Sequence, residues 1–389
     1  MKILFVNNIF PLFAKSDSGA SVRSMRLIKA LTKLGHVDVI SFLDDETSNL
    51  EGCDVVYSKY IQEESLWYNN WEKIRLITHQ YHLQDIWPLN ERKCKAVKTI
   101  INQNEYDIIV VRYMKMAGEC GLVEYADKLV VDVDDDPKSV IRMLHKTGSL
   151  LGRLFWHYVY ANAVDRMTNY VLDRIMCAFN SQPEKRYPNT TYLPNISIFS
   201  TALPDVDFAS TPQNILFVGR MDHKPNAQAL KHFLLFIFPI LLKSHPTASL
   251  RVVGEIKQPE LLQLCRSIPN VVLCGFVGDI LTEYRKCRCV VIPLITGTGT
   301  SVKLVEAMSL NRAVVTTSVG ARGLNDAFVQ GEDYLLEDRN YEFAKAVSLL
   351  LEDEIQNHRI ANSACQKVKK YYSEELFNKI VKEAISYAK

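Results

Sequence analysis

Short apolar runs alternate with amphipathic helical patterns along the first half of the chain. Ile3–Val6 predicts a buried strand because the run is short and continuous, and Ser21–Leu34 predicts a helix with leucines on one face that ends at Gly35. Further strands are predicted at Val37–Phe42, Val55–Tyr57, Ile108–Arg112, Leu129–Val133 and Ile175–Phe179, and further helices at Cys94–Asn102 and Leu150–Met167. Strands separated by helices indicate a parallel sheet covered on both faces.

The segment Pro188–Pro212 interrupts this alternation with several prolines among Asn, Ser and Thr, as is typical of a linker. Strands are then predicted at Ile215–Val218, Ser249–Val253, Val271–Leu273, Val290–Ile292 and Ala313–Thr316, with helices at Val302–Met308 and Glu374–Tyr387. The pattern predicts an α/β protein with two doubly wound, Rossmann-like domains facing each other across a cleft. We expect the first domain at 1–198 and the second at 199–369, with a final helix in 370–389 packing back on the first.

Length and composition narrow the class of protein. The 389 residues favour about two domains, and 48% hydrophobic with 23% charged residues is typical of a soluble globular protein. A formal net charge of +2 is too small to indicate nucleic-acid binding. Nine cysteines without CxxC pairs indicate neither a zinc site nor a disulfide framework, and they favour a reducing cytoplasm. We expect neither a signal peptide nor a membrane-spanning segment, since no apolar run approaches about 20 residues.

The most informative stretch is VVIPLITGTGTSVKLVEAMSLNRAVVTTSVGARGL, residues 290–324, which predicts a strand, a polar turn, a helix and a second strand. Helix N-termini attract phosphate through unpaired N–H groups and a partial positive charge. Lys303 adds a mobile positive charge, and Glu306 can accept hydrogen bonds from vicinal sugar hydroxyls. In the turn, glycines allow close backbone approach and hydroxyls donate hydrogen bonds or cap the helix; these residues are Gly297, Thr298, Gly299, Thr300 and Ser301. The arrangement suits a diphosphate next to a ribose.

Two further loops follow strands of the second half, where an open α/β sheet binds its ligands. In VGRMDHKPN, Gly219 follows the strand, and Arg220 and Lys224 can neutralise a departing diphosphate, although surface cations are often simply solvated. In CGFVGD, the backbone around Phe276 and Val277 either recognises the edge of a nucleobase or forms a plain tight turn.

The first half offers two loops of its own. The loop Phe10–Gly19 is either a plain connection or a place where Gly19 brings the backbone close to phosphate or sugar. Acidic residues crowd the end of the Leu129–Val133 strand, at Asp132, Asp134, Asp135 and Asp136. They act as a base or positioning group for an acceptor hydroxyl, bind a metal through Asp132 and Asp134, or start a helix at Asp136-Pro137 with Asp135 as its cap.

Two other sets of residues have a structural and a functional interpretation. His79 and His82 either bind a metal or are structural, and the lack of a carboxylate at supporting spacing favours the second. Two groups of aromatic and basic residues either contact lipid headgroups or belong to the core. These groups are Trp67, Tyr68 and Trp71 with Lys73 and Arg75, and Arg153, Phe155, Trp156 and Tyr158.

The runs FVGRMDHKPNAQALKHF, CGFVGD and PLITGTGTSVKLVEAMSLNRAVVTTSVGARGL together resemble the retaining glycosyltransferases of the GT-B fold, in particular the polysaccharide and glycoconjugate branch of the GT4 family. The resemblance spans most of the chain and is strongest over Ile215–Leu324. It implies that Glu306 binds the nucleotide ribose. It also implies that Arg220 and Lys224 form the family's phosphate pair, although Lys224 stands one residue closer than usual and Lys303 shares the task.

The sequence departs from the family at two positions. Many members carry a glutamate where this chain has Thr298, so backbone amides of the Gly297–Ser301 turn take over the contact with the donor sugar. The acceptor-side histidine is absent as well, and Asp134 or Asp135 stands in for it. The resemblance implies no metal for the leaving group, since cations and helix ends stabilise it.

The sequence thus predicts a cytoplasmic retaining glycosyltransferase, with possible peripheral contact at the inner face of the plasma membrane. Its donor is a nucleotide diphosphate sugar, UDP- or GDP-linked, its acceptor is a glycan or lipid-linked molecule, and no further cofactor is required. Three alternatives stay open: a metal-dependent transferase using Asp132 and Asp134, an epimerase or phosphorylase on the same fold, and a non-catalytic subunit of a polysaccharide assembly complex.

Overall fold

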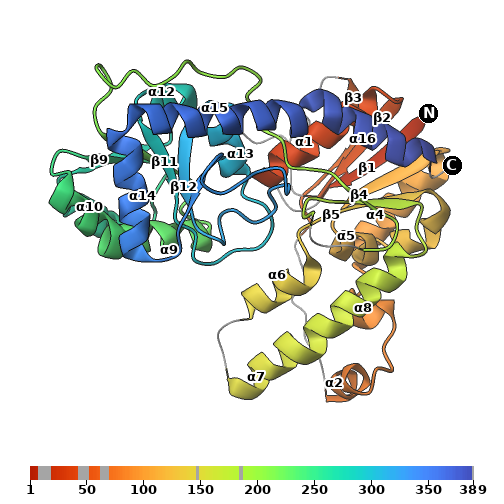
Figure 1. Ribbon diagram of the computed structural model, residues 1–389. Coiled ribbons are helices and arrows are strands. Elements are labelled where there is room, and N and C mark those ends of the chain that lie inside the picture. Colours follow the sequence, from red (N-terminus) through yellow and green to blue (C-terminus); the bar gives the residue numbers. More distant parts are fainter. Residues whose placement is uncertain (8–18, 43–51, 62–69, 146–148, 184–186, 388–389) are drawn as a thin grey trace. The chain divides into compact units, whose positions relative to one another are not determined.

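The computed structural model describes residues 1–7, 19–42, 52–61, 70–145, 149–183 and 187–387 (Figure 1). They form two compact units, residues 1–194 with 375–389 and residues 195–374. Each unit is built on one parallel sheet with helices on its faces. The predicted α/β class with two doubly wound sheets is therefore confirmed.

The sheet of the first unit has the strand order β3-β2-β1-β4-β5-β6-β7. Its strands are β1 (Lys2–Asn7), β2 (His36–Ser41), β3 (Cys53–Ser58), β4 (Ile108–Arg112), β5 (Leu129–Asp134), β6 (Cys177–Asn180) and β7 (Thr190–Tyr192). The central strands β4 and β5 are buried at every position, which explains their continuous apolar runs. The order of strands reverses between β1 and β4, and such a switch point is where open α/β sheets bind ligands.

The helices of this unit are α1 (Gly19–Thr32), α2 (Asn70–Ile77), α3 (Leu83–Ile86), α4 (Glu91–Gln103), α5 (Met114–Glu119), the 3-10 helix η1 (Leu122–Lys128), α6 (Pro137–Leu144), α7 (Leu150–Leu154), the π-helical segment η2 (Phe155–Tyr160), α8 (Ala161–Leu172) and α16 (Glu374–Tyr387). They cover the faces of the sheet, except for α2, α6 and α7, which lie in an extension away from it (Figure 1). Gly19 is the first residue of α1, so it begins a helix rather than ending a loop. The expected ligand-binding loop before it, residues 10–18, lies outside the described residues.

Two sequence expectations about this unit were wrong in detail. The proline-rich segment Pro188–Pro212 is not a linker throughout, because it contains β7, which pairs with β6 at the edge of the sheet. The helix expected at Leu150–Met167 continues to Leu172 and is widened at η2. The aromatic residues of η2 do not predict a π-helical segment from the sequence, because the hydrogen bonds of such a segment depend on tertiary packing.

The sheet of the second unit has the order β10-β9-β8-β11-β12-β13. Its strands are β8 (Asn214–Val218), β9 (Ser249–Val253), β10 (Val271–Gly275), β11 (Cys289–Ile292), β12 (Ala313–Thr316) and β13 (Leu335–Leu336). The helices are α9 (Lys224–His232), the π-helical segment η3 (Phe233–Ile237), α10 (Phe238–Ser244), α11 (Pro259–Arg266), α12 (Ile280–Arg285), α13 (Val302–Ser309), α14 (Asn340–Glu352) and α15 (Glu354–Tyr371).

The continuous helical run Lys224–Ser244 is, by length and composition alone, apolar enough to cross a membrane. Its apolar face lies in the core of the second unit, where Phe233, Leu234 and Phe238 are almost completely buried. The run is therefore accounted for as a core helix. The π-helical turn η3 ends two residues before Pro239, which cannot donate a backbone hydrogen bond to the preceding turn.

Candidate functional site

The switch point of the second sheet lies between β8 and β11, which are neighbours in the sheet. The carboxyl end of β8 leads into Gly219 and Arg220, and that of β11 leads into the Gly297–Ser301 turn and α13. Two loops singled out from the sequence therefore emerge from adjacent strands at the same edge of the sheet. A ligand at this edge contacts both of them.

Lys303 and Asn226 connect these two loops. The Lys303 ammonium donates a hydrogen bond to Asn226 Oδ1 at 2.6 Å, and Asn226 Nδ2 donates one to the Arg220 carbonyl at 2.8 Å. A Cβ atom placed on Gly219 would lie 3.1 Å from Lys303 Nζ, so glycine leaves the room in which the ammonium sits. Lys303 is therefore a fixed cation rather than the mobile one expected. The sequence argument did not single out Asn226, although the proline before it marks the start of α9.

Burial lowers the pKa of Lys303 to about 8, because desolvation disfavours the ammonium and the carboxylate of Glu306 offsets this only in part. Desolvation and the Lys303 charge also lower the pKa of His223, the residue before α9. Both shifts indicate a partly dehydrated, electropositive site. An anion placed there would stabilise the ammonium that the protein alone disfavours.

The Gly297–Ser301 turn itself depends on glycine. Gly299 has φ +71° and Gly297 has φ +149°, backbone conformations that residues with a side chain rarely adopt. Gly323 packs against the turn so closely that a Cβ there would lie 1.9 Å from Thr300 Cγ2. Arg322 donates a hydrogen bond to the Gly297 carbonyl. Arg322 and Gly323, in the segment between β12 and β13, thus hold the Gly297–Ser301 turn in place.

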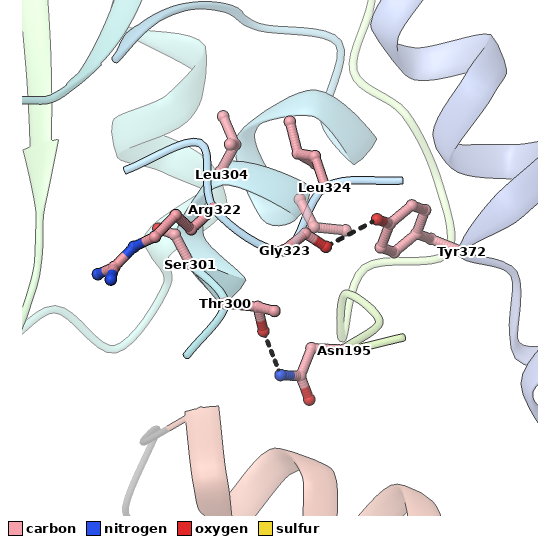
Figure 2. A pocket seen from close by; sticks show the side chains of 9 residues that line it. Asn195, Thr300, Ser301, Leu304, Arg322, Gly323, Leu324 and Tyr372 are labelled. Carbon is pink, nitrogen blue, oxygen red and sulfur yellow. Dashed lines mark hydrogen bonds between the residues drawn. The ribbon is translucent and has the colours of Figure 1, made fainter. Parts of the chain in front are cut away.

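Figure 2 shows the pocket that this turn lines together with Asn195, Arg322 and Tyr372. Asn195 Nδ2 donates to Thr300 Oγ1, and Tyr372 OH lies 3.4 Å from the Gly323 carbonyl. Asn195 and Tyr372 carried no signal in the sequence, because they are about 105 and 70 residues away from the turn along the chain and meet it only in the folded unit.

Ser301 occupies the N-cap position of α13, but its side chain makes no capping hydrogen bond. Its Oγ atom is buried and has no hydrogen-bond partner among the described residues. The expectation that a hydroxyl of this turn caps α13 was therefore wrong. A buried hydroxyl without a partner is costly, so a hydrogen-bonding ligand at the α13 N-terminus would stabilise it.

Arg220 and Lys224 are placed differently from Lys303. The Arg220 guanidinium is half exposed and binds the carboxylate of Asp222 at 2.5 Å, which raises its pKa. Lys224 is the exposed first residue of α9. The ammonium group that lies beside Gly219 and contacts the first turn of α9 belongs to Lys303, not to Lys224. Arg220 needs to leave Asp222 before it can bind a phosphate group.

The loops after β8, β9 and β10 approach one another through glycines. The Gly219 N–H bonds to the Val253 carbonyl, and the Gly254 N–H bonds to the Gly275 carbonyl at 2.8 Å. A Cβ on Gly254 would lie 2.0 Å from the Gly219 carbonyl oxygen. This close packing links the Gly219 loop to the turn that holds Phe276 and Val277. Phe276 is 71% exposed, so its ring faces solvent and is available to a planar ligand.

In the first unit, Asp132 is completely buried between two arginines. It binds Arg23 of α1 at 2.7 Å and also binds Arg112 of β4. The Asp132 carboxylate is fully engaged by these guanidinium groups, which does not favour the alternative in which Asp132 and Asp134 bind a metal. The crowded carboxylates are stabilised by paired arginines instead.

Asp134 lies at the edge of this network. Its carboxylate accepts from Arg112 Nη2 at 3.2 Å, and its backbone is left-handed with φ +52°. Tyr113, which follows β4, has φ +68° as well, and such strained residues gather at functional sites. Asp135 is half-buried beside it. The helix cap is Asp136, whose carboxylate accepts from the Ser139 N–H, so assigning the cap to Asp135 was wrong.

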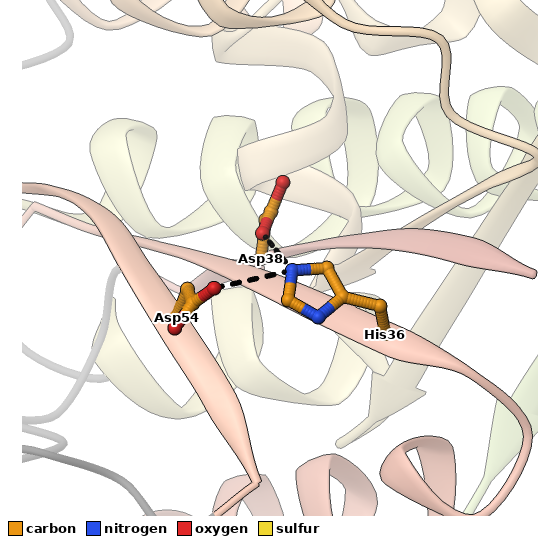
Figure 3. Close-up of side chains that lie close together, drawn as sticks. All are labelled: His36, Asp38 and Asp54. Carbon is orange, nitrogen blue, oxygen red and sulfur yellow. Dashed lines mark hydrogen bonds and ion pairs between the residues drawn. The ribbon is translucent and has the colours of Figure 1, made fainter.

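Figure 3 shows one further cluster, at the edge of the first sheet where the strands begin. His36 Nε2 lies 2.9 Å from Asp38 Oδ1 and 3.3 Å from Asp54 Oδ2. Asp38 also accepts a hydrogen bond from Tyr106 at 2.6 Å, so protein groups already bind its carboxylate. Within the described residues this is the one group with the spacing of metal ligands, and it does not include His82.

His82 instead begins a helix. It stands at the N-cap of α3, and its N–H bonds to the carboxylate of Asp85 at 2.8 Å. The interpretation of His82 as a structural residue therefore has a local explanation, since Asp85 completes a capping box.

Comparison with known proteins finds a family model that matches the region of the second sheet. Residues 212–353 match the model of the family described as Glycosyl transferases group 1. A protein in the cps region of Klebsiella pneumoniae, described as an uncharacterized 44.6 kDa protein, is 25% identical over 178 residues. That alignment covers 44% of this chain and 45% of the Klebsiella protein, so it spans less than half of either.

Solved structures match along the whole chain. Sucrose-phosphate synthase from Thermosynechococcus elongatus has a TM-score of 0.72 at 16% identity, covering 99% of this chain and 98% of that one. HepE from Anabaena, in complex with UDP and glucose, has a TM-score of 0.64 at 16% identity and full coverage of both chains. TarM of S. aureus has a TM-score of 0.68 at 10% identity, covering 99% and 98%.

At these identities the solved structures establish the fold, which is that of the GT-B glycosyltransferases. The matched residues 212–353 contain Gly219, Asn226, Lys303 and Glu306, the residues around the switch point of the second sheet. Within the second unit, residues 212–353 are thus similar to the group 1 glycosyl transferases.

Proposed function

We propose that this protein is a retaining glycosyltransferase that moves a hexose-type sugar from a nucleotide diphosphate sugar to a glycan or lipid-linked acceptor. The observation that carries the proposal is the contact of Lys303 with Asn226, beside Gly219 and the N-terminus of α13, within the matched residues. This arrangement offers an ammonium, backbone N–H groups and the hydroxyl of Ser301 to one anionic group.

Each residue then has a role in donor binding. Lys303 and the α13 N-terminus bind the diphosphate and stabilise the charge that develops as it leaves. Arg220 exchanges Asp222 for a phosphate oxygen, and Lys224 contributes from the exposed start of α9. Glu306, one turn into α13, accepts hydrogen bonds from the ribose hydroxyls. Backbone amides of the Gly297–Ser301 turn contact the donor sugar, with Thr298 where related enzymes carry a glutamate.

The remaining proposals concern donor, acceptor and location. A complex of HepE with UDP and glucose supports UDP over GDP as the donor nucleotide. The Klebsiella relative from a cps region supports a place in cell-surface polysaccharide synthesis. On the acceptor side, Asp134 or Asp135 positions the attacking hydroxyl, next to the strained backbone of Tyr113. The nine cysteines without a disulfide among them support a cytoplasmic location.

A thermal-shift screen with UDP-, GDP-, ADP-, dTDP- and CMP-sugars tests the donor first, because a ligand that binds only the folded state raises Tm. The donor that raises Tm is then supplied with candidate acceptors, and the anomeric configuration of the product is read by NMR. We expect Glu306→Ala to weaken binding of the nucleotide sugar. Unchanged turnover of every nucleotide sugar by this variant would show that the site is wrongly assigned.

The same assays separate the alternatives. Loss of activity in EDTA would indicate a metal-dependent transferase. Turnover of a nucleotide sugar without acceptor, or of glycan with orthophosphate, would indicate an epimerase or a phosphorylase. Binding of a donor without turnover under any condition would indicate a non-catalytic subunit of an assembly complex.

A further inference from the structure

The helices that follow β5 pack on one another as an extension of the first unit (Figure 1). Arg142 of α6 donates to the His157 carbonyl of η2 at 3.1 Å, and the His157 ring contacts the His145 carbonyl at 2.9 Å. The Trp156 ring stacks on the His145 ring with centroids 4.0 Å apart. Phe155 and Trp156 are half-buried against the core. Of the aromatic and basic group expected here from the sequence, Phe155 and Trp156 are therefore used for packing, whereas Arg153 and Tyr158 are exposed.

A different face of these helices is exposed and apolar. On α7 and η2 the exposed residues recur at helical spacing, with Leu150 at 65%, Leu154 at 44% and Tyr158 at 62% exposure. Leu151 is 80% exposed, and Leu144 at the end of α6 is 63% exposed. We call these five residues the leucine face. Single exposed leucines are ordinary, but a run on adjoining helices marks a surface that binds a partner or a membrane.

The sequence that contains the leucine face carries charges of one sign. Between Pro137 and Val164 the sequence holds Lys138, Arg142, Lys146 and Arg153 and no aspartate or glutamate. Lys138 is paired with Asp165 at 3.2 Å, just beyond this stretch. Arg153 lies on α7 beside Leu154 of the leucine face and is exposed. A helix with leucines on one side and cations around them is the pattern of a segment that lies on an anionic membrane surface.

We propose that the leucine face is a docking surface for an anionic lipid bilayer, with α7 lying in the headgroup layer. Leucine side chains enter the boundary between headgroups and acyl chains, while the exposed Arg153 pairs with lipid phosphates. A second copy of the chain is a poorer occupant, because two such faces would bring like-charged Arg153 side chains together, and Asp165, the acidic residue nearest to Arg153 in the sequence, is already paired with Lys138. This inference does not depend on the identity of the sugar donor.

Co-sedimentation of the full chain with phosphatidylcholine vesicles, with and without about one third phosphatidylglycerol, tests the proposal. We expect binding to the mixed vesicles that weakens with added salt, and at least about tenfold weaker binding to phosphatidylcholine alone. The double variant Leu151→Glu with Leu154→Glu should reduce binding to the mixed vesicles by about tenfold or more. The matched control is Ile355→Glu, on α15 of the second unit, where the isoleucine is 82% exposed.

The variants are compared with the wild type for Tm and for the Tm increase given by a nucleotide sugar, so that a folding defect is recognised. Failure of the wild type to bind anionic vesicles would overturn the proposal. So would equal binding of the double variant and the wild type, or equal loss in Ile355→Glu. A dimer in size-exclusion chromatography that the double variant alone abolishes, without vesicle binding, would show that a second copy covers the leucine face.

Discussion

The Lys303 ammonium lies 2.6 Å from the Asn226 side-chain oxygen, and this contact joins the first turns of α13 and α9 at the switch point of the second sheet. It brings a largely buried cation to the place where two helices begin. Each helix N-terminus carries a partial positive charge, so the cation and the helices repel one another in the absence of an anion. The protein thus accepts an unfavourable charge that a diphosphate would neutralise.

Replacement of Lys303 by Met should separate binding from stability. We expect affinity for the nucleotide diphosphate to fall about 10- to 100-fold, because a hydrogen bond to a charged group contributes about 1.5–3 kcal/mol. Unfolding free energy should stay the same or rise by up to about 2 kcal/mol, since a buried ammonium is removed. Isothermal titration calorimetry and urea denaturation measure the two effects. Lys345→Met on α14, where the lysine is exposed, is the control and should change neither.

The pH dependence of the same contact has a defined sign. The pKa of Lys303 is lowered to about 8 in the folded protein, whereas that of an unfolded lysine is about 10.4. Between these values the unfolded chain binds more protons, so this group makes the folded state more stable as pH rises from about 8 to 10. Nucleotide affinity should do the opposite and fall above pH 8, because the neutral amine loses its attraction for the diphosphate.

Titrations at pH 7, 8 and 9 in buffers of different ionisation enthalpy measure this coupling. Proton uptake on binding should appear in the wild type near pH 8–9, because the bound anion restores the ammonium. The Lys303→Met variant should show no such uptake. Identical pH profiles for wild type and variant would rule out Lys303 as the coupled group.

The contact of Gly323 with Thr300 should be sensitive to a single methyl group. Gly323→Ala adds a Cβ that would lie 1.9 Å from Thr300 Cγ2 at φ +79°, so we expect a loss of about 2 kcal/mol or more. Gly331→Ala is a matched control, because its φ is +82° but open space surrounds its Cβ. Urea denaturation of both variants isolates the clash from the backbone strain. Equal losses would show that Thr300 yields without cost.

The buried carboxylate of Asp132 should matter for stability rather than for metal binding. Asp132→Ala leaves the buried guanidinium groups of Arg23 and Arg112 without their main partner, which should cost about 3–5 kcal/mol. Asp173→Ala, an exposed aspartate beside Arg174, should cost less than about 0.5 kcal/mol. Thermal denaturation of both, with and without EDTA, provides the measurement. A stable Asp132→Ala protein that loses metal-dependent activity would support the metal interpretation instead.

The strands of both sheets were largely predictable, because each central strand is apolar at successive positions and ends at glycine or polar residues. The π-helical segments η2 and η3 and the edge strand β7 were not, since no local pattern distinguishes them from helix or linker. The left-handed Asp134 shows the same limit. Its carboxylate accepts a hydrogen bond from Arg112 on the neighbouring strand, a contact that the acidic run in which it lies does not predict.

The sequence by itself determined the α/β alternation, the glycine-rich turn before α13 and the loop after β8, because periodicity and turn chemistry act over a few residues. Only the tertiary structure decided which charges meet. Lys303 joins Asn226 from 77 residues away, and Asp132 joins Arg23 from 109 residues away, since parallel strands bring distant loops to one edge of a sheet. Burial at these contacts lowers the pKa of Lys303 and pairs Asp132 with two arginines. Both outcomes depend on the exclusion of solvent by the whole unit that contains each contact.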